Sequence, residues 1–156
     1  MERSDKKSDS IFYEQPRFVT HIDDHAIESL AKYYSENLEQ NSKLVDLCSS
    51  WISHLPHNLA FQEVIGIGMN DKELKKNPSL TKYYVHDLNK DPSLINLIPE
   101  ESVDAVLCAV SVDYMIRVNN IIAFKIQKPK SKHSFPKPQF IFNFSQLNYF
   151  LKFTRF

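Results

Sequence analysis

The stretch from Val103 to Val110 is the most apolar run in the chain, and it shows almost no alternation between apolar and polar residues. A strand with one face in water alternates, whereas a strand covered on both faces reads as a continuous apolar run. Shorter apolar runs precede it, separated by helical or irregular stretches. We therefore expect an α/β fold with a parallel sheet, whose four strands cover residues 44–47, 64–69, 83–86 and 103–110.

Helix signals lie before the first of these strands and also between the strands. Asp24 precedes apolar residues at helical spacing, which predicts an amphipathic helix that is capped by this Asp and ends near Asn41. A short helix is expected over residues 51–55 and another over residues 72–77, each ended by a following proline.

The remaining composition limits the class of protein. The chain has 156 residues, enough for one domain with a core, and no apolar run approaches the roughly 18 residues that would span a membrane. Residues 1–11 carry both charge signs without the apolar centre of a secretory signal, so we expect a disordered lead-in. Cys48, Cys108 and the six histidines show no metal-ligand spacing. Buried thiols and an intracellular location are favoured, without a named compartment.

The charge changes sign along the chain. No Asp or Glu follows Asp113, whereas eight Lys or Arg residues do, so the overall net charge of zero divides into an acidic part and a basic part. Residues 116–156 are rich in Phe, Tyr, Lys and Asn and show no helical period, although residues 139–144 alternate as a plain strand does. We read this segment as a basic aromatic tail.

Two interpretations of the tail remain. Lysines beside aromatic rings could bind single-stranded nucleic acid. The same residue types are those of A/T-rich codons, as in an intron read in frame, and we favour this second interpretation. Nucleic acid is therefore not an expected partner.

The ends of the predicted strands are the place to look for a ligand, because open parallel sheets bind ligands outside the carboxyl ends of their strands. Polar residues stand at each of these ends, which fits an adenosyl ligand. They are Asp46 with the Cys48-Ser49-Ser50 loop, Asn70, Asp87 and Ser111.

Several separate motifs, in this order along the chain, resemble a subgroup of the class I, type 11-like methyltransferases. They are PRFVTHID at 16–23, DLCSSWISHLP at 46–56, GIGMN at 66–70, EL at 73–74, NP at 77–78 and DLN at 87–89. The resemblance covers about residues 12–115. It implies the N-terminal part of a Rossmann-like methyltransferase domain, S-adenosylmethionine as the cofactor, and a methyl acceptor that the motifs do not identify.

The resemblance also implies roles for single positions. The loop that passes under the methionine part of the cofactor matches Asp46, Cys48, Ser49 and Ser50. Asn70 matches the residue that holds the ribose hydroxyls, and Asp87 the one that reads the adenine amino group, with the backbone amide of Leu88 beside the ring. Ser111 matches a position near the methyl-bearing sulfur.

The sequence departs from the family pattern in ways that predict weaker binding. Only Gly66 and Gly68 are present, so the loop after the first strand lacks glycine. Asn70 replaces an acid and gives up a charge-assisted hydrogen bond. Asp46 also suits a residue that only caps the next helix, and Cys48 has no evident base to activate it, which favours a buried thiol.

The family's later elements are not found in residues 116–156. This predicts a domain cut short after the fourth strand, with impaired or no catalysis. The alternative is a non-enzymatic isoform or interaction protein that pairs with an intact relative, or with itself, through the exposed edge of the fourth strand.

Overall fold

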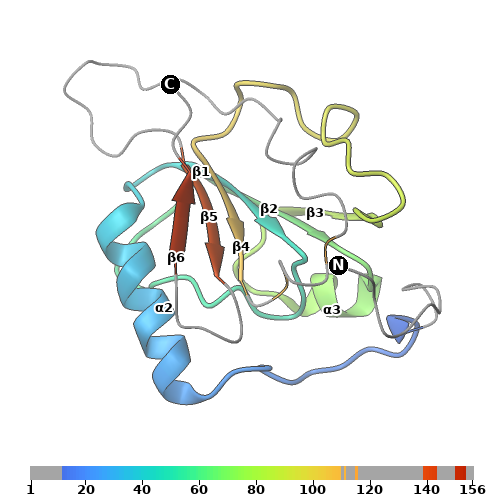
Figure 1. The fold of residues 1–156 in the computed structure, drawn as a ribbon, viewed down its shortest axis with the longest axis horizontal. Helices are drawn as coiled ribbons and strands as arrows, with labels where there is room; N and C mark the ends of the chain where they lie inside the picture. Colours follow the sequence, from blue (N-terminus) through green and yellow to red (C-terminus); the bar gives the residue numbers. More distant parts are fainter. Residues whose placement is uncertain (1–11, 110, 112–114, 116–138, 144–149, 154–156) are drawn as a thin grey trace.

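A computed structural model describes residues 12–109, 111, 115, 139–143 and 150–153 (Figure 1). The predicted lead-in 1–11 and most of the predicted tail therefore lie outside the described residues. In chain order the elements are α2 (Asp24–Asn37), β1 (Lys43–Leu47), β2 (Glu63–Gly68), α3 (Asp71–Lys76), β3 (Lys82–Val85), β4 (Ala105–Cys108), β5 (Gln139–Asn143) and β6 (Phe150–Phe153).

These strands form one sheet in the order β3-β2-β1-β4-β5-β6. All neighbours are parallel except β5 and β6, which are antiparallel. The four predicted strands are confirmed, with β4 shorter than the apolar run that predicted it. The central strands are buried along almost their whole length, as continuous apolar runs indicate. The architecture is a Rossmann-like parallel α/β sheet.

The expectation that the fourth strand lies at a sheet edge is wrong. β4 pairs with β1 on one side and with β5 on the other, in register Ala105 to Gln139. The backbone groups of β4 thus find partners on both sides, which removes the open edge proposed for self-association. That the resemblance to the methyltransferase family ends near residue 115 stays a prediction.

Two helix predictions need correction. Asp23, not Asp24, caps α2, because its Oδ1 accepts the Ala26 amide at 2.8 Å, and the helix ends at Asn37. Residues 51–55 form no helix. The reason lies in side-chain bonds from α3's C-cap, Asn77, whose Nδ2 donates to the Ser50 carbonyl at 2.9 Å and to Ser53 Oγ at 2.8 Å. These bonds hold the segment in an irregular path.

The sheet has a core on each face. On one face α2 packs against alternate strand residues, and the buried residues there are Leu30, Tyr34, Leu38, Leu44, Val64, Ala105 and Leu107. On the other face the loop between β3 and β4 supplies the cover, and the buried residues are Val45, Leu47, Ile65, Ile67, Leu88, Leu94, Ile98, Val103, Val106, Cys108 and Met115. Figure 1 shows α2 beside the sheet and this loop, in yellow, on the other side.

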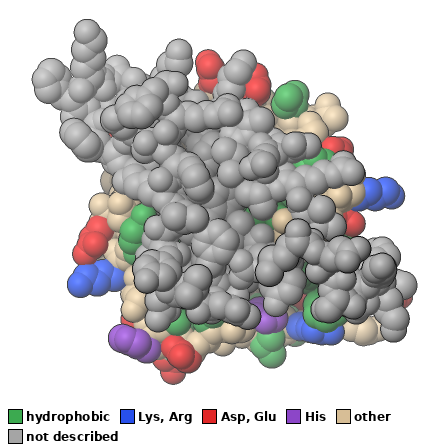
Figure 2. Space-filling view, in the orientation of Figure 1, with side chains coloured by type: hydrophobic (Ala, Val, Ile, Leu, Met, Phe, Trp, Pro, Cys, Tyr) green, Lys and Arg blue, Asp and Glu red, His purple; other side chains and the backbone are tan. Residues whose placement is uncertain are grey.

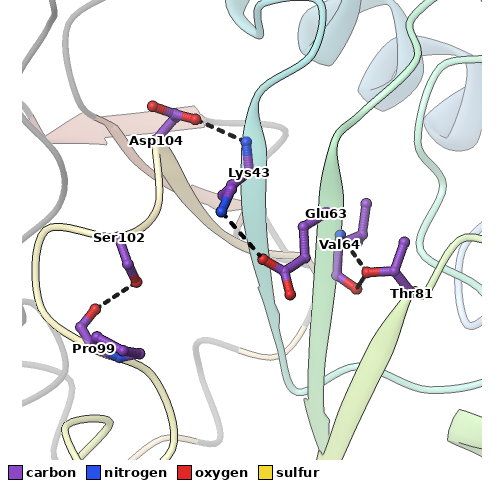
Figure 3. A network of polar contacts seen from close by, with 7 residues as sticks. All are labelled: Lys43, Glu63, Val64, Thr81, Pro99, Ser102 and Asp104. Carbon is purple, nitrogen blue, oxygen red and sulfur yellow. Dashed lines mark hydrogen bonds and ion pairs between the residues drawn. The ribbon is translucent and has the colours of Figure 1, made fainter.

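Polar contacts fix the register at the amino ends of the strands (Figure 3). Asp104 accepts the Lys43 amide through Oδ2 at 2.8 Å, and its own amide donates to the Lys43 carbonyl at 2.8 Å. Thr81 Oγ1 accepts the Val64 amide at 3.0 Å. The Lys43–Glu63 ion pair, at 3.8 Å, is partly exposed and contributes little by itself. These contacts all lie at the end of the sheet opposite to the carboxyl ends of the strands.

In the view of Figure 2, the described acidic and basic side chains that are visible lie around the rim of the molecule, with the two signs interspersed. Within the described residues, no helix has the length and apolar character needed to cross a membrane.

Candidate functional site

The carboxyl ends of β1 and β4 lie side by side at the point where the winding of the sheet reverses. From β1 the chain winds outward through β2 to β3, and then returns to place β4 on the other side of β1. In open parallel sheets such a reversal is where ligands bind. The predicted site residues that follow β1, β2, β3 and β4 all lie at this carboxyl edge.

The loop after β1 lies directly against β2. The Ser49 amide donates to the Ile67 carbonyl at 2.8 Å, and Cys48 takes a left-handed backbone conformation with φ of 54°. A β-carbon added to Gly68 would collide with the Ser49 carbonyl oxygen. Because Gly68 has no side chain, the Ser49 backbone can lie this close to β2, although the loop itself contains no glycine.

Asp46 is buried beneath this loop, with 5% of its surface exposed. Ser53 Oγ donates to its Oδ2 at 2.7 Å, and Asn77 in turn donates to Ser53 Oγ. Burial raises the pKa of Asp46 to about 6, although the Ser49 and Ser53 hydroxyls act to lower it. Asp46 thus faces inward and acts on the loop through Ser53, rather than capping a helix.

Ser49 Oγ is buried near the Asp46 carboxyl group, whose pKa it acts to lower, but it makes no hydrogen bond of good geometry to a described residue. A buried hydroxyl without a well-formed hydrogen bond is unusual in a folded protein. The close approach of the Ser49 backbone to Gly68, at the reversal of the sheet, makes this loop the part of the edge best suited to receive a ligand.

Asn70 stands after β2, as predicted, but its side chain is fully engaged within the protein. Its Oδ1 accepts the amides of Lys72 and Glu73, at 3.0 and 3.2 Å, and so caps α3. Its Nδ2 donates to the carbonyl of Tyr13 at 2.8 Å and, more weakly, to that of Glu14 at 3.4 Å. Asn70 therefore joins α3 to the N-terminal segment.

That segment, residues 12–19, runs across the edge, and we call it the strap. It is hydrogen-bonded to Asn70, Glu73 and Trp51. Glu73 accepts the Arg17 amide through Oε1 at 2.6 Å and the Ser50 hydroxyl through Oε2 at 2.6 Å. The Trp51 indole donates to the Val19 carbonyl at 2.9 Å. The buried Glu73 carboxylate thus ties the strap to the loop after β1. The motif at 73–74 marked this region by resemblance, but no spacing in the sequence indicated the bonds.

Two substitutions of Asn70 separate its two structural roles, which are the cap of α3 and the bond to the strap. We expect Asn70→Ala to lower the free energy of unfolding by about 1 kcal/mol, the usual cost of a lost helix cap, and to release the strap. Asn70→Asp keeps an acceptor for the cap but has no donor for the Tyr13 carbonyl. It should keep most of the stability in urea while limited proteolysis cuts near residues 13–17. Equal destabilisation by both substitutions would contradict this division.

Asp87, Leu88 and Ser111 lie where the sequence placed them, after β3 and β4. Asp87 Oδ1 accepts the amides of Asn89 and Lys90, at 2.9 and 3.1 Å, and holds a turn with one of its two carboxylate oxygens. Leu88 is buried in the core under the β3–β4 loop, and Ser111 is half-buried. The His86 amide donates to the Gly68 carbonyl at 2.8 Å, which ties this loop to the end of β2.

The described part of the chain holds no group of three or more His, Cys, Asp or Glu residues that could bind a metal ion. His54 lies partly buried near the strap, where desolvation lowers its pKa. The polar groups at the edge include hydroxyls, amides and carboxylates, and the thiol of Cys48 lies beside them.

Known structures share this fold. A chain in the complex between the Haloferax volcanii Trm112 methyltransferase activator and its methyltransferase aligns with a TM-score of 0.56 and 14% identity, over 76% of this chain and 52% of its own length. The fold is that of the S-adenosylmethionine-dependent methyltransferases. One such enzyme from Mesorhizobium loti aligns with a TM-score of 0.50 and 16% identity, over 73% of this chain and 52% of its own.

A methyltransferase from Thiobacillus denitrificans in complex with S-adenosyl-L-homocysteine also aligns, with a TM-score of 0.50 and 13% identity, over 85% of this chain and 53% of its own. The chain thus spans about half the length of these methyltransferase structures. No protein-family model and no curated protein matches its sequence.

Proposed function

We propose that the carboxyl edge of the sheet binds S-adenosylmethionine, as part of a methyltransferase-type site. The observation that carries the proposal is the loop after β1, which lies at the reversal of the sheet with the Ser49 backbone packed against Gly68. A similar fold in the Thiobacillus denitrificans methyltransferase holds S-adenosyl-L-homocysteine. The cofactor would supply the methyl group, and the chain's residues would bind and orient it.

Residues along the edge receive roles in this proposal. Ser49 and Ser50 would hold the methionine part, with Asp46 and Cys48 supporting the loop from beneath. Asp87 would accept from the adenine amino group, since its turn uses only Oδ1, with the Leu88 backbone beside the ring. Ser111 would border the methyl-bearing sulfur.

Asn70 fits its proposed ribose contact only if the strap moves, because its amide group already holds α3 and the Tyr13 carbonyl. A carboxamide also forms weaker bonds to hydroxyls than a carboxylate does. We therefore propose weak cofactor binding and impaired methyl transfer, with the acceptor unassigned. The non-enzymatic alternative, pairing through a free edge, would have to use β3 or β6, since β4 is paired on both sides.

Thermal unfolding with and without S-adenosylhomocysteine tests the proposal. A ligand that binds only the folded state at a hundred times its Kd stabilises it by about 2.7 kcal/mol, so we expect the midpoint to rise by several degrees. Asp87→Ala should abolish this rise by removing the adenine contact.

The matched control is Asp91→Ala, which removes a similar turn in the same loop, where Asp91 Oδ1 accepts the Ser93 amide at 3.0 Å. This variant should keep the ligand-induced rise. A wild-type midpoint that S-adenosylhomocysteine leaves unchanged would refute cofactor binding, and an equal loss in both variants would refute the role of Asp87.

A further inference from the structure

The two cysteines of the chain meet at the reversal point of the sheet. Cys108 is the last residue of β4, and it lies opposite Leu47, the last residue of β1, in the β1–β4 pairing. Cys48 is the next residue after Leu47. Both cysteines are free thiols, with Cys108 buried and Cys48 half-buried.

The backbone of Cys48 turns its side chain toward Cys108. Successive residues of a strand point to opposite faces, so a regular continuation of β1 would place Cys48 on the α2 face, away from Leu47 and Cys108. The left-handed φ of 54° at Cys48 breaks this alternation. Its side chain packs instead against the core cluster that contains Cys108.

The spacing suits a bond between the two sulfurs. Neighbouring strands lie about 4.8 Å apart and a strand advances about 3.3 Å per residue, so a residue one step beyond its partner lies on the order of 6 Å away between Cα atoms. Disulfides span roughly 4.4–6.8 Å between Cα atoms. In agreement with this proximity, the Cys48 thiol raises the pKa of Cys108 through a hydrogen bond, and burial raises it further.

We propose that Cys48 and Cys108 form a thiol–disulfide switch at the carboxyl edge, which hydrogen peroxide closes and a dithiol reductant opens. The sulfur of Cys48, which is the more exposed, attacks the peroxide oxygen, giving a sulfenic acid and one water. The Cys108 sulfur then attacks the Cys48 sulfur, the disulfide bond forms, and the sulfenic oxygen leaves as a second water. In total two thiols lose two hydrogens and peroxide becomes two waters.

The order of attack follows from the surroundings of the two thiols. The raised pKa and the burial of Cys108 slow its own reaction with the oxidant. Cys48 therefore reacts first, and Cys108 acts second as the resolving cysteine, passing its proton to the sulfenic oxygen that leaves. A disulfide between β4 and Cys48 would fix the start of the Ser49-Ser50 loop against the sheet. If this loop holds the cofactor, which rests on the proposed function, oxidation would change cofactor binding.

Oxidation of the intact chain tests the switch without any ligand. The reduced protein is treated with hydrogen peroxide, digested without reductant and analysed by mass spectrometry. We expect a monomer that has lost two hydrogens, a peptide pair joined through Cys48 and Cys108, and reversal by dithiothreitol. Cys108→Ser should leave Cys48 as sulfenic or sulfinic acid, whereas Cys48→Ser should leave Cys108 reduced.

A wild-type chain in which Cys48 becomes sulfinic acid while Cys108 stays a thiol would overturn the switch, and so would a disulfide-linked dimer in place of the internal bond. The effect on the site is measured separately, as the S-adenosylhomocysteine-induced rise in melting temperature before and after oxidation. We expect the rise to differ between the two forms. Absence of the rise in the reduced chain would count against the proposed function alone, because the cross-link is scored without ligand.

Discussion

Asp46→Asn should stabilise the chain at pH 7–8 by about 3 kcal/mol and leave its stability at pH 4 almost unchanged. Burial raises the pKa of this carboxyl from 3.8 to about 6 in the folded protein, and a tenfold change in an acid dissociation constant corresponds to about 1.36 kcal/mol. The charged form is therefore disfavoured in the folded state, and folding at neutral pH carries that cost. A neutral amide of the same shape avoids it.

The direction of the pH dependence follows from proton counts. Between pH 3.8 and about 6 the folded chain still holds the Asp46 proton, which the unfolded chain has released. The folded state binds more protons in this window, so its stability falls as the pH rises through it. Below the window both states are protonated and the cost is absent, whereas above it the cost is complete.

Urea unfolding of the wild type and of Asp46→Asn across pH 4–8 measures this difference, because the other carboxyls cancel in the comparison. Asp91→Asn is the matched control, since Asp91 is exposed and its amide variant can still accept the Ser93 amide. The control should show no such window. A destabilised Asp46→Asn at pH 8 would show that the Ser53 bond to the carboxylate outweighs the cost of burial.

The same buried Asp46 shows what the sequence could and could not predict. Its place within the apolar run at 44–47 located it near the end of β1, since continuous apolar runs identify buried strands well. Its partner Ser53 lies in residues 51–55, where a helix was expected. That expectation failed because Asn77, far along the chain, binds this segment with its side chain, and local periodicity carries no information on such a bond.

The strand at residues 139–143 shows the opposite case, because its local structure was predicted but its place in the sheet was not. The alternation at residues 139–144 indicated a strand, but composition led us to separate it from the domain. The structure pairs Gln139–Asn143 with β4 because the backbone of a buried strand requires a partner on each side. Register between distant segments depends on this pairing, which a local pattern does not encode. Similarly, Asn70 was correctly located, but its bond to the strap could not be foreseen.

Gly68→Ala should cost about 2 kcal/mol of unfolding free energy, within the range for added volume in a packed site, and should abolish the response to S-adenosylhomocysteine. The new methyl group would collide with the Ser49 carbonyl oxygen, and with a Leu74 methyl group 3.0 Å away. A backbone carbonyl cannot rotate aside as a side chain can. The loop after β1 must therefore leave its place against β2, which is the place that the proposed cofactor site requires.

Gly66→Ala, two residues earlier on the same strand, is the matched control. The three atoms nearest to a β-carbon there all belong to the side chain of Leu80, whose end can rotate away. The cost should therefore stay under about 1 kcal/mol, and the ligand response should persist. Urea unfolding and ligand-dependent melting of both variants decide the matter. If Gly68→Ala and Gly66→Ala gave the same results in both measurements, the loop after β1 could accommodate the added methyl group. The close approach of Ser49 to β2 could then no longer support the site. If only Gly68→Ala lost the response, Gly68 on β2 would do what a glycine in the loop after β1 does in the family pattern. The close approach of the two backbones would then depend on a missing side chain in the strand and not in the loop.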